Sequence, residues 1–197
     1  FQENKKKDVV AFSSGNHAQG VAYAASLMGV NATIVMPEDT PMMKIEKTKS
    51  LGAKVIFYDR YKESRQAIAK EIASDTAAFL IPAYDHFDVI SGQGTAALEA
   101  IHQMALIEEK INYFICPVGG GGLIAGCSIA IKHYFDQSKI IGVEPELFND
   151  TQLSLKYNSI ITNKEKPLSA RKKTIDNLSK SLKKIKEPII IVHGGGS

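Results

Sequence analysis

Four consecutive glycines, Gly119 to Gly122, are the most unusual feature of this sequence. A short apolar run at Tyr113–Cys116 precedes them and predicts a buried strand, and an Ala/Ile-rich segment at Leu123–Tyr134 with helical spacing follows them. A strand, a glycine loop and a helix in this order bring unpaired backbone N–H groups and the positive end of a helix dipole to one spot. Because glycine has no Cβ, such a loop can wrap closely around a phosphate. The predicted chemistry is therefore anion binding by the backbone.

The glycine run differs from the common nucleotide-binding motifs. No Lys-Ser or Lys-Thr follows it, so it is not a Walker loop, and it fits the G-x-G-x-x-G dinucleotide spacing poorly. A phosphate that is held mainly by backbone suits a bound cofactor better than a hydrolysed nucleotide. The alternative is a tight turn that binds nothing. Four adjacent glycines argue against that alternative because they lose much chain entropy on folding.

A second polar loop, Ser13-Ser14-Gly15-Asn16-His17, follows an earlier apolar run. Its hydroxyls, its amide and the N–H groups at the start of the next helix suit a carboxylate or a second anionic group. On its own, such a stretch is equally typical of a helix N-cap with a turn glycine. His17 has no matching nucleophile nearby, and its spacing favours a structural role.

Strand and helix patterns alternate through the first part of the chain. We expect strands at 8–12, 31–36, 54–58 and 78–81, and helices at 18–28, 42–51 and 61–74. This alternation predicts a parallel sheet covered by helices on both faces. Ligands of such sheets bind beyond the carboxyl ends of the strands, where both polar loops are expected to lie.

The second half predicts a larger, partly represented domain. After a loop at 82–90, we expect a helix at 92–105 and, beyond the glycine loop and its helix, a strand at 139–143. The predicted domains are a small open α/β domain at 1–90, part of a large domain at 91–158, and a divergent tail at 159–197. In the tail, an apolar stripe predicts an amphipathic helix within 164–186 and an apolar run predicts a strand at 189–192. The stripe consists of Ile175, Leu178, Leu182 and Ile185.

Composition excludes few classes of protein. The 197 residues are 44% hydrophobic and 23% charged, which is ordinary for a soluble globular protein, and a net charge of +3 gives no indication of a nucleic-acid partner. The two cysteines, Cys116 and Cys127, stand in apolar contexts, which predicts a reducing, cytoplasmic setting without disulfides. Nothing resembles a signal peptide or a membrane span. The first residue is Phe1 rather than Met, and we expect a fragment.

Four motifs in the same order resemble those of the fold-type-II pyridoxal-phosphate enzymes. They are SSGNHAQGVAYAA at 13–25, SGQGTAALE at 91–99, PVGGGGLIAG at 117–126 and VEPE at 143–146. Within these enzymes, residues 1–158 are most similar to threonine dehydratase and serine racemase. The resemblance implies the three-layer αβα parallel sheets of the tryptophan synthase beta-like fold, incomplete at both ends. It also implies a homo-oligomer.

The resemblance implies a role for each residue of the two loops. The phosphate of pyridoxal 5′-phosphate is expected at Gly119, Gly120, Gly121 and Gly122, and Asn16 is expected to hydrogen-bond its 3′-oxygen. The pocket for the substrate carboxylate is expected to be lined by Ser13, Ser14, Gly15 and His17. Ser14 matches the second proton carrier of serine racemase, on the face opposite the lysine.

The VEPE motif implies a cation site. Glu144, Asp150 and a backbone carbonyl near Phe148 match the position at which serine racemase-like proteins bind Mg²⁺ or Ca²⁺. Oxygen ligands suit such hard cations. The alternative is a pair of solvated acids in a loop.

The implied reaction is β-elimination from threonine or serine, which gives a 2-oxo acid and ammonia, as in the threonine dehydratase of isoleucine biosynthesis. Two alternatives remain open: a serine racemase, and a non-catalytic module that binds phosphate or pyridoxal phosphate. The family's Schiff-base lysine lies upstream of the SSGNH run in a Ser-Phe-Lys-type motif, and only twelve residues precede Ser13 here. Lys5, Lys6 and Lys7 have the wrong neighbours, and no Ser or Cys matches the family's partner of the pyridine nitrogen. We therefore expect this chain, as written, to lack lysine-dependent turnover.

The tail resembles a different family. Residues 159–197, which end in IVHGGGS, look like the amino-terminal part of an isopentenyl phosphate kinase-like member of the amino-acid kinases. That family's first Lys-x-Gly-Gly loop is absent, and Lys156-Tyr157-Asn158 stands in its place. We interpret this as two partial genes joined near Tyr157, and we expect no kinase activity from so short a piece.

Overall fold

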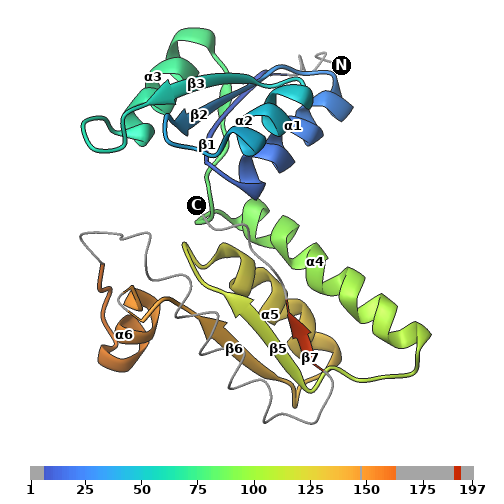
Figure 1. Cartoon of the computed structure of the whole chain (residues 1–197). Coiled ribbons are helices and arrows are strands. Elements are labelled where there is room, and N and C mark those ends of the chain that lie inside the picture. The colour runs from blue at the N-terminus through green and yellow to red at the C-terminus, as the bar shows by residue number, and fades with distance from the viewer. Residues whose placement is uncertain (1–6, 147, 163–188, 192–197) are drawn as a thin grey trace, which may run out of the picture. The chain divides into compact units, whose positions relative to one another are not determined.

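The structure is a computed structural model that describes residues 7–146, 148–162 and 189–191. The chain divides into two compact units, one ending at Ala83 and the other beginning at Tyr84 (Figure 1). The boundary predicted between residues 90 and 91 falls inside helix α4 (Phe87–Leu106). Lys5, Lys6, the predicted tail helix within 164–186 and the terminal glycine loop lie outside the described residues.

The first unit is built on a four-stranded parallel sheet of order β3-β2-β1-β4. Its strands are β1 (Val9–Phe12), β2 (Ala32–Pro37), β3 (Lys54–Tyr58) and β4 (Phe79–Leu80). Its helices are α1 (Asn16–Met28), α2 (Met42–Ser50) and α3 (Arg65–Thr76). Figure 1 shows α1 and α2 on one face of this sheet and α3 on the other. The predicted parallel α/β fold is confirmed.

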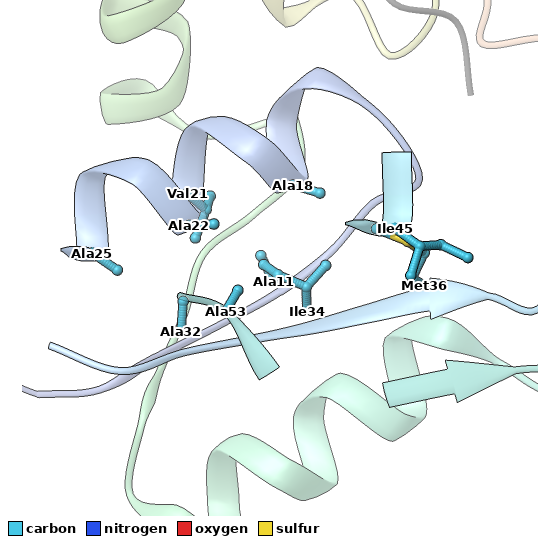
Figure 2. Close-up of a cluster of buried hydrophobic side chains, with 10 residues drawn as sticks. All are labelled: Ala11, Ala18, Val21, Ala22, Ala25, Ala32, Ile34, Met36, Ile45 and Ala53. Atoms are coloured by element: carbon cyan, nitrogen blue, oxygen red, sulfur yellow. The ribbon is translucent and has the colours of Figure 1, made fainter. Parts of the chain in front are cut away.

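Alternating side chains of the strands form a core on each face of this sheet. Ala11, Ile34 and Met36 belong to the cluster under α1 and α2, which Figure 2 shows with the alanines of α1 facing the strands. Val10 and Val35, one residue out of phase, pack in the cluster under α3. The period of two that marks a strand thus delivers apolar side chains to both faces, as a covered parallel sheet requires. The small residues of α1 let this helix pack close against the strands.

The second unit contains a three-stranded parallel sheet of order β6-β5-β7. Its elements are α4, β5 (Tyr113–Pro117), α5 (Gly122–Tyr134), β6 (Lys139–Val143), α6 (Asp150–Tyr157) and β7 (Ile189–Ile191). Phe114 and Cys116 of β5 pack in one buried cluster with side chains of α4 and α5, among them Ile101 and Ile131. The strand predicted at 189–192 is confirmed at residues 189–191, where it pairs with β5.

Helices α4 and α5 cross at a pair of glycines. A Cβ placed on Gly94 would lie 2.8 Å from the carbonyl oxygen of Gly126, and one placed on Gly126 would overlap the carbonyl oxygen of Ile90. The Sγ of Cys127 also donates to the carbonyl oxygen of Gln93 at 3.5 Å. Glycine at both positions therefore lets the two backbones meet directly, and the crossing fixes where α5 begins.

The starts of α3 and α4 differ most from the predictions. Helix α3 begins at Arg65 rather than residue 61, because the Ser64 hydroxyl accepts the N–H of Ala67. Helix α4 begins at Phe87 rather than residue 92, because the His86 imidazole accepts the N–H of Asp88 at 3.3 Å. Helix α6 was not predicted. Among the described residues, no helix is both long and apolar enough to cross a membrane.

Candidate functional site

Each polar loop follows a strand from which later strands are added on both sides of the sheet. Such a strand marks a topological switch point. In the first unit, β1 lies between β2 and β4, and residues 13–17 leave its carboxyl end. In the second unit, β5 lies between β6 and β7, and residues 118–121 leave its carboxyl end. Such switch points open a crevice between the diverging connections, and ligands of parallel α/β sheets bind there. The topology of each unit therefore singles out one of the two loops predicted from the sequence.

The four glycines of the second loop have different environments. Gly121 has φ +85°, a left-handed conformation that favours glycine. Gly120 and Gly122 lie against Tyr84: a Cβ on Gly120 would overlap its ring, and one on Gly122 would lie 2.8 Å from its carbonyl oxygen. Gly119 is different again, because a Cβ there would meet no atom within 4 Å. Conformation or packing explains three of the glycines, whereas Gly119 leaves an open place beside the loop.

The glycine loop also carries a group of free backbone donors. Within the described part of the chain, the N–H groups of Gly119, Gly120 and Gly121 donate to no backbone carbonyl. Gly121 is the N-cap residue of helix α5, and no side chain caps that helix. Its first-turn N–H groups therefore add to the positive end of the helix dipole. Free N–H donors at a helix start, beside a site that a single Cβ would occupy, fit a phosphate group.

The first loop leaves the start of α1 uncapped. The residue at the N-cap is Gly15, and no side chain accepts a hydrogen bond from the first turn. The Ser13 hydroxyl instead accepts the N–H of Gly15 at 3.2 Å. The stretch thus includes the helix N-cap named as the alternative, with Gly15 at the cap position and no capping side chain. Ser14 is 7% exposed and Asn16 is exposed, so a polar group can approach the helix start from the side of Asn16.

His17 is the second residue of α1, and its Nε2 is buried without a hydrogen-bond partner among the described residues. Burial lowers the pKa of His17, since the charged imidazolium loses its hydration. The side chain is therefore neutral near pH 7. A neutral imidazole with one unsatisfied ring nitrogen can offer a hydrogen bond to a ligand or to water but no charge.

The two cysteines are not candidate nucleophiles. Cys116 and Cys127 are both buried as free thiols in the cluster beneath α4 and α5. Burial raises the pKa of Cys116 to about 12, with a further contribution from the nearby Cys127, and burial also raises the pKa of Cys127. Because the thiolate is the reactive form, neither group is activated.

In the structure, the carboxylate of Glu144 at the predicted cation site caps a helix. Both carboxylate oxygens of Glu144 accept backbone N–H groups at the start of α6, from Thr151 at 2.9 Å and from Gln152 at 2.8 Å. Asp150 stands in the first turn of the same helix. No group of three or more His, Cys, Asp or Glu side chains that could hold a metal occurs in residues 7–146, 148–162 and 189–191. Glu144 is thus a helix-capping residue, and its role toward a cation remains a prediction.

The match to known proteins decides the family. A family model described as "pyridoxal-phosphate dependent enzyme" matches residues 1–195. The chain belongs to the pyridoxal-phosphate dependent enzymes. Proteins of this family use pyridoxal phosphate, and the free N–H groups at the start of α5 fit its phosphate. The predicted family and its tryptophan synthase beta-like fold are confirmed.

Relatives within this family act on several amino acids. The chain is 46% identical over 159 residues to L-threo-3-hydroxyaspartate ammonia-lyase of Saccharomyces cerevisiae, and 43% identical over 160 residues to serine racemase of Schizosaccharomyces pombe. Each match covers 81% of this chain and 48% of the relative. A solved structure of threonine deaminase from T.th. is similar with a TM-score of 0.74 and 40% identity, over 83% of this chain and 53% of that one. The chain therefore spans about half the length of the curated relatives it matches.

Sequence reasoning missed Tyr84. It stands in the stretch predicted as a plain loop at 82–90, and its contact with Gly120 and Gly122 joins residues far apart in the chain. The available signal was an aromatic residue shortly before the SGQGT motif. Without the fold, nothing related that residue to the glycine loop.

Proposed function

We propose that this protein is a pyridoxal-phosphate-dependent ammonia-lyase that converts threonine or serine to a 2-oxo acid and ammonia. The observation that carries the proposal is the glycine loop: uncapped N–H donors at the start of α5, with an open place beside Gly119, at the switch point of a parallel sheet. Membership of the family supplies the cofactor. The relatives named threonine deaminase and hydroxyaspartate ammonia-lyase support a lyase that acts on a β-hydroxy amino acid.

In this proposal the two loops bind different groups. Gly119 to Gly122 hold the cofactor phosphate through backbone N–H groups, and the Asn16 amide donates to the cofactor's 3′-oxygen. Ser13, Gly15 and the start of α1 receive the substrate carboxylate, because no side chain caps the first-turn N–H groups of α1; the N–H of Gly15 itself donates to the Ser13 hydroxyl. His17, which burial keeps neutral, offers a hydrogen bond without adding a charge.

When bound, pyridoxal phosphate supplies a sink for the electron pair that remains after the Cα proton leaves. The β-hydroxyl then departs as water, and the unsaturated amine that results hydrolyses to a 2-oxo acid and ammonia. The Ser14 hydroxyl is proposed to carry a proton at Cα on one face of the substrate. Removal of the Cα proton on the opposite face followed by proton return from Ser14 would give racemisation instead, which the likeness to serine racemase keeps as the alternative activity.

The test of the proposal is ligand titration of the 197-residue chain. We expect pyridoxal phosphate to bind, detected by its absorbance and by dialysis, at least tenfold more tightly than inorganic phosphate. Gly119→Val places a branched side chain in the open place without meeting a protein atom within 4 Å of the Cβ, so it should abolish binding while the fold persists. The matched control is Gly92→Ala, which lies inside α4 and is equally free of contacts.

Two outcomes would contradict the assignment. Equal affinity for pyridoxal phosphate and inorganic phosphate would indicate a non-catalytic anion-binding module. Unchanged binding in Gly119→Val would remove the glycine loop from the site. Because the printed sequence contains no Ser-Phe-Lys motif, we expect the 197-residue chain by itself to bind the cofactor and release no ammonia from threonine or serine.

We further propose Mg²⁺ or Ca²⁺ at Glu144, Asp150 and the carbonyl near Phe148, because this stretch resembles the cation site of serine racemase-like proteins and oxygen ligands suit hard cations. Since Glu144 already caps α6, a cation would bind to the outer lone pairs of a carboxylate that is held in place. Millimolar Ca²⁺ should then raise the melting temperature of the chain but not that of Glu144→Gln. Equal shifts in both proteins would show that no such site exists.

A further inference from the structure

In the second unit, the ring of Tyr84 packs directly against the backbone of Gly120. A Cβ on Gly120 would overlap the ring, and the main chain of Tyr84 lies against the neighbouring Gly122, whose Cβ would be 2.8 Å from the Tyr84 carbonyl oxygen and 3.2 Å from its Cα. One residue therefore covers two of the four loop glycines. Tyr84 does not cover Gly119, where a Cβ would meet no atom within 4 Å.

Tyr84 is itself held in place by the helix that follows it. Its carbonyl oxygen accepts the N–H of His86 at 3.1 Å, and His86 is the N-cap of α4. Helix α4 in turn is locked against α5 at the crossing of Gly94 and Gly126. The glycine loop lies at the start of α5, so two contacts restrain it. One is with its own helix, and the other is with the ring of Tyr84, just before α4.

Tetraglycine segments are otherwise among the most adaptable in a chain, because each residue has access to both halves of φ. A loop that binds a phosphate through several N–H groups binds tightly only if these groups already converge, since ordering them on binding costs affinity. The ring contact restricts Gly120, and the main chain and Cβ of Tyr84 restrict Gly122. Tyr84 is 41% exposed, so it is not needed to fill the core and its position calls for another explanation.

We propose that Tyr84 is a positioning residue that holds the glycine loop in its phosphate-binding shape. This inference rests on the proposed function, because it assigns to the loop the binding of the cofactor phosphate. Tyr84 acts through the backbone of Gly120 and Gly122, and its hydroxyl is not required.

The test compares the affinities of Tyr84 variants for pyridoxal phosphate and for inorganic phosphate. Tyr84→Ala is expected to weaken both about tenfold, because both ligands use the same N–H groups. Tyr84→Phe should retain wild-type affinity, since it keeps the ring. The matched control is Phe87→Ala, a nearby aromatic truncation on a side chain that is 86% exposed, and it should change neither affinity.

A second variant tests the contact between Tyr84 and Gly120. Gly120→Ala should weaken binding on its own, because its methyl group displaces the loop from the ring. In the double variant Tyr84→Ala/Gly120→Ala the obstacle is gone, so the added methyl should cost little beyond Tyr84→Ala alone. Strict additivity of the two changes would show that the residues do not act through one contact.

Each remaining outcome has a definite meaning. If the wild-type chain binds pyridoxal phosphate and Tyr84→Ala binds it equally well, the inference is wrong and the proposed function stands. If Tyr84→Ala loses affinity for pyridoxal phosphate but not for phosphate, Tyr84 contacts another part of the cofactor and the inference is again wrong. If the wild-type chain binds neither ligand, both the function and the inference fall.

Discussion

At the scale of residues, the glycine loop shows that identical side chains are present for different reasons. Gly121 has a left-handed backbone that favours glycine. Gly120 and Gly122 leave room for Tyr84 to pack against the loop. Neither reason applies to Gly119. The sequence predicted the loop as one motif with one purpose. Phosphate binding is the proposed reason only at Gly119, and it is there that substitution should separate ligand affinity from stability.

The first prediction concerns that separation. Gly121→Ala should lower the free energy of unfolding by about 1 kcal/mol, because an L-residue is strained at a positive φ. Gly119→Ala should change it by less than about 0.5 kcal/mol, since the added methyl group meets no atom. Urea unfolding of the two variants measures both values. Equal losses of unfolding free energy in the two variants would contradict the different environments of Gly119 and Gly121.

The second prediction concerns pH. His17 has a lowered pKa in the folded chain, so the unfolded chain binds the proton more readily as the pH falls through the ordinary histidine range near 6.5. The free energy of unfolding should therefore fall between about pH 7 and pH 5 more steeply in the wild type than in His17→Gln. Urea titrations at closely spaced pH values compare the slopes. Parallel slopes would mean that His17 titrates normally and is not buried.

At the scale of elements, the sequence predicted the kinds of helix and strand well and the helix starts less well. Apolar periodicity located every strand of the first sheet within two residues at either end, since each is a short apolar run bounded by polar residues or breakers. The starts of α3 and α4 were missed because each depends on one backbone N–H, which donates to the Ser64 hydroxyl in α3 and to the imidazole of His86 in α4. Histidine is not among the residues that signal a helix start, so periodicity alone could not place α4.

The third prediction uses two glycines of α4. Gly94→Ala should destabilise the protein by roughly 2 kcal/mol or more, because its methyl group would lie 2.8 Å from the Gly126 carbonyl oxygen at the crossing with α5. Gly92→Ala, in the same helix and free of contacts, should stabilise it by about 0.5–1 kcal/mol through helix propensity. Opposite signs in chemical denaturation are expected. Two changes of the same sign would contradict the crossing.

Helix α6 supplies the fourth prediction. It has no side-chain cap at its own N-cap residue, Asn149, and depends instead on the carboxylate of Glu144. Glu144→Ala should cost about 1 kcal/mol and expose the amides of Thr151 and Gln152 to hydrogen exchange. Exchange of α5 amides in the same sample is the internal control. Unchanged protection at the start of α6 would exclude the capping role.

At the scale of the whole molecule, the family and its cofactor were predictable from four ordered motifs, whereas the substrate was not. The relatives differ in substrate while sharing the loops, and the chain spans about half of their length. The predicted kinase-like tail at 159–197 remains a prediction; the family match extends through residue 195, and the only tail strand in the described residues pairs with β5.

The fifth prediction follows from ligand linkage. Pyridoxal phosphate at about a hundred times its dissociation constant should stabilise the unit that binds it by about 2.7 kcal/mol. For a unit of this size the melting temperature should rise by roughly 5–10 °C, and Gly119→Val should abolish the rise. Differential scanning fluorimetry gives the comparison. A rise of the same size in both proteins would place the binding site elsewhere.

The parallel pairing of β7 with β5 has a consequence for biosynthesis. Every strand of the first sheet lies within residues 9–80, so that sheet can assemble while the ribosome is still translating the rest of the message. The β5 strand, in contrast, keeps one edge open until residues 189–191 emerge. An unpaired parallel edge is a site of aggregation and pairs slowly over such a separation. Nascent chains whose residues 189–191 have not emerged should therefore bind chaperones through the second unit, and released chains should not.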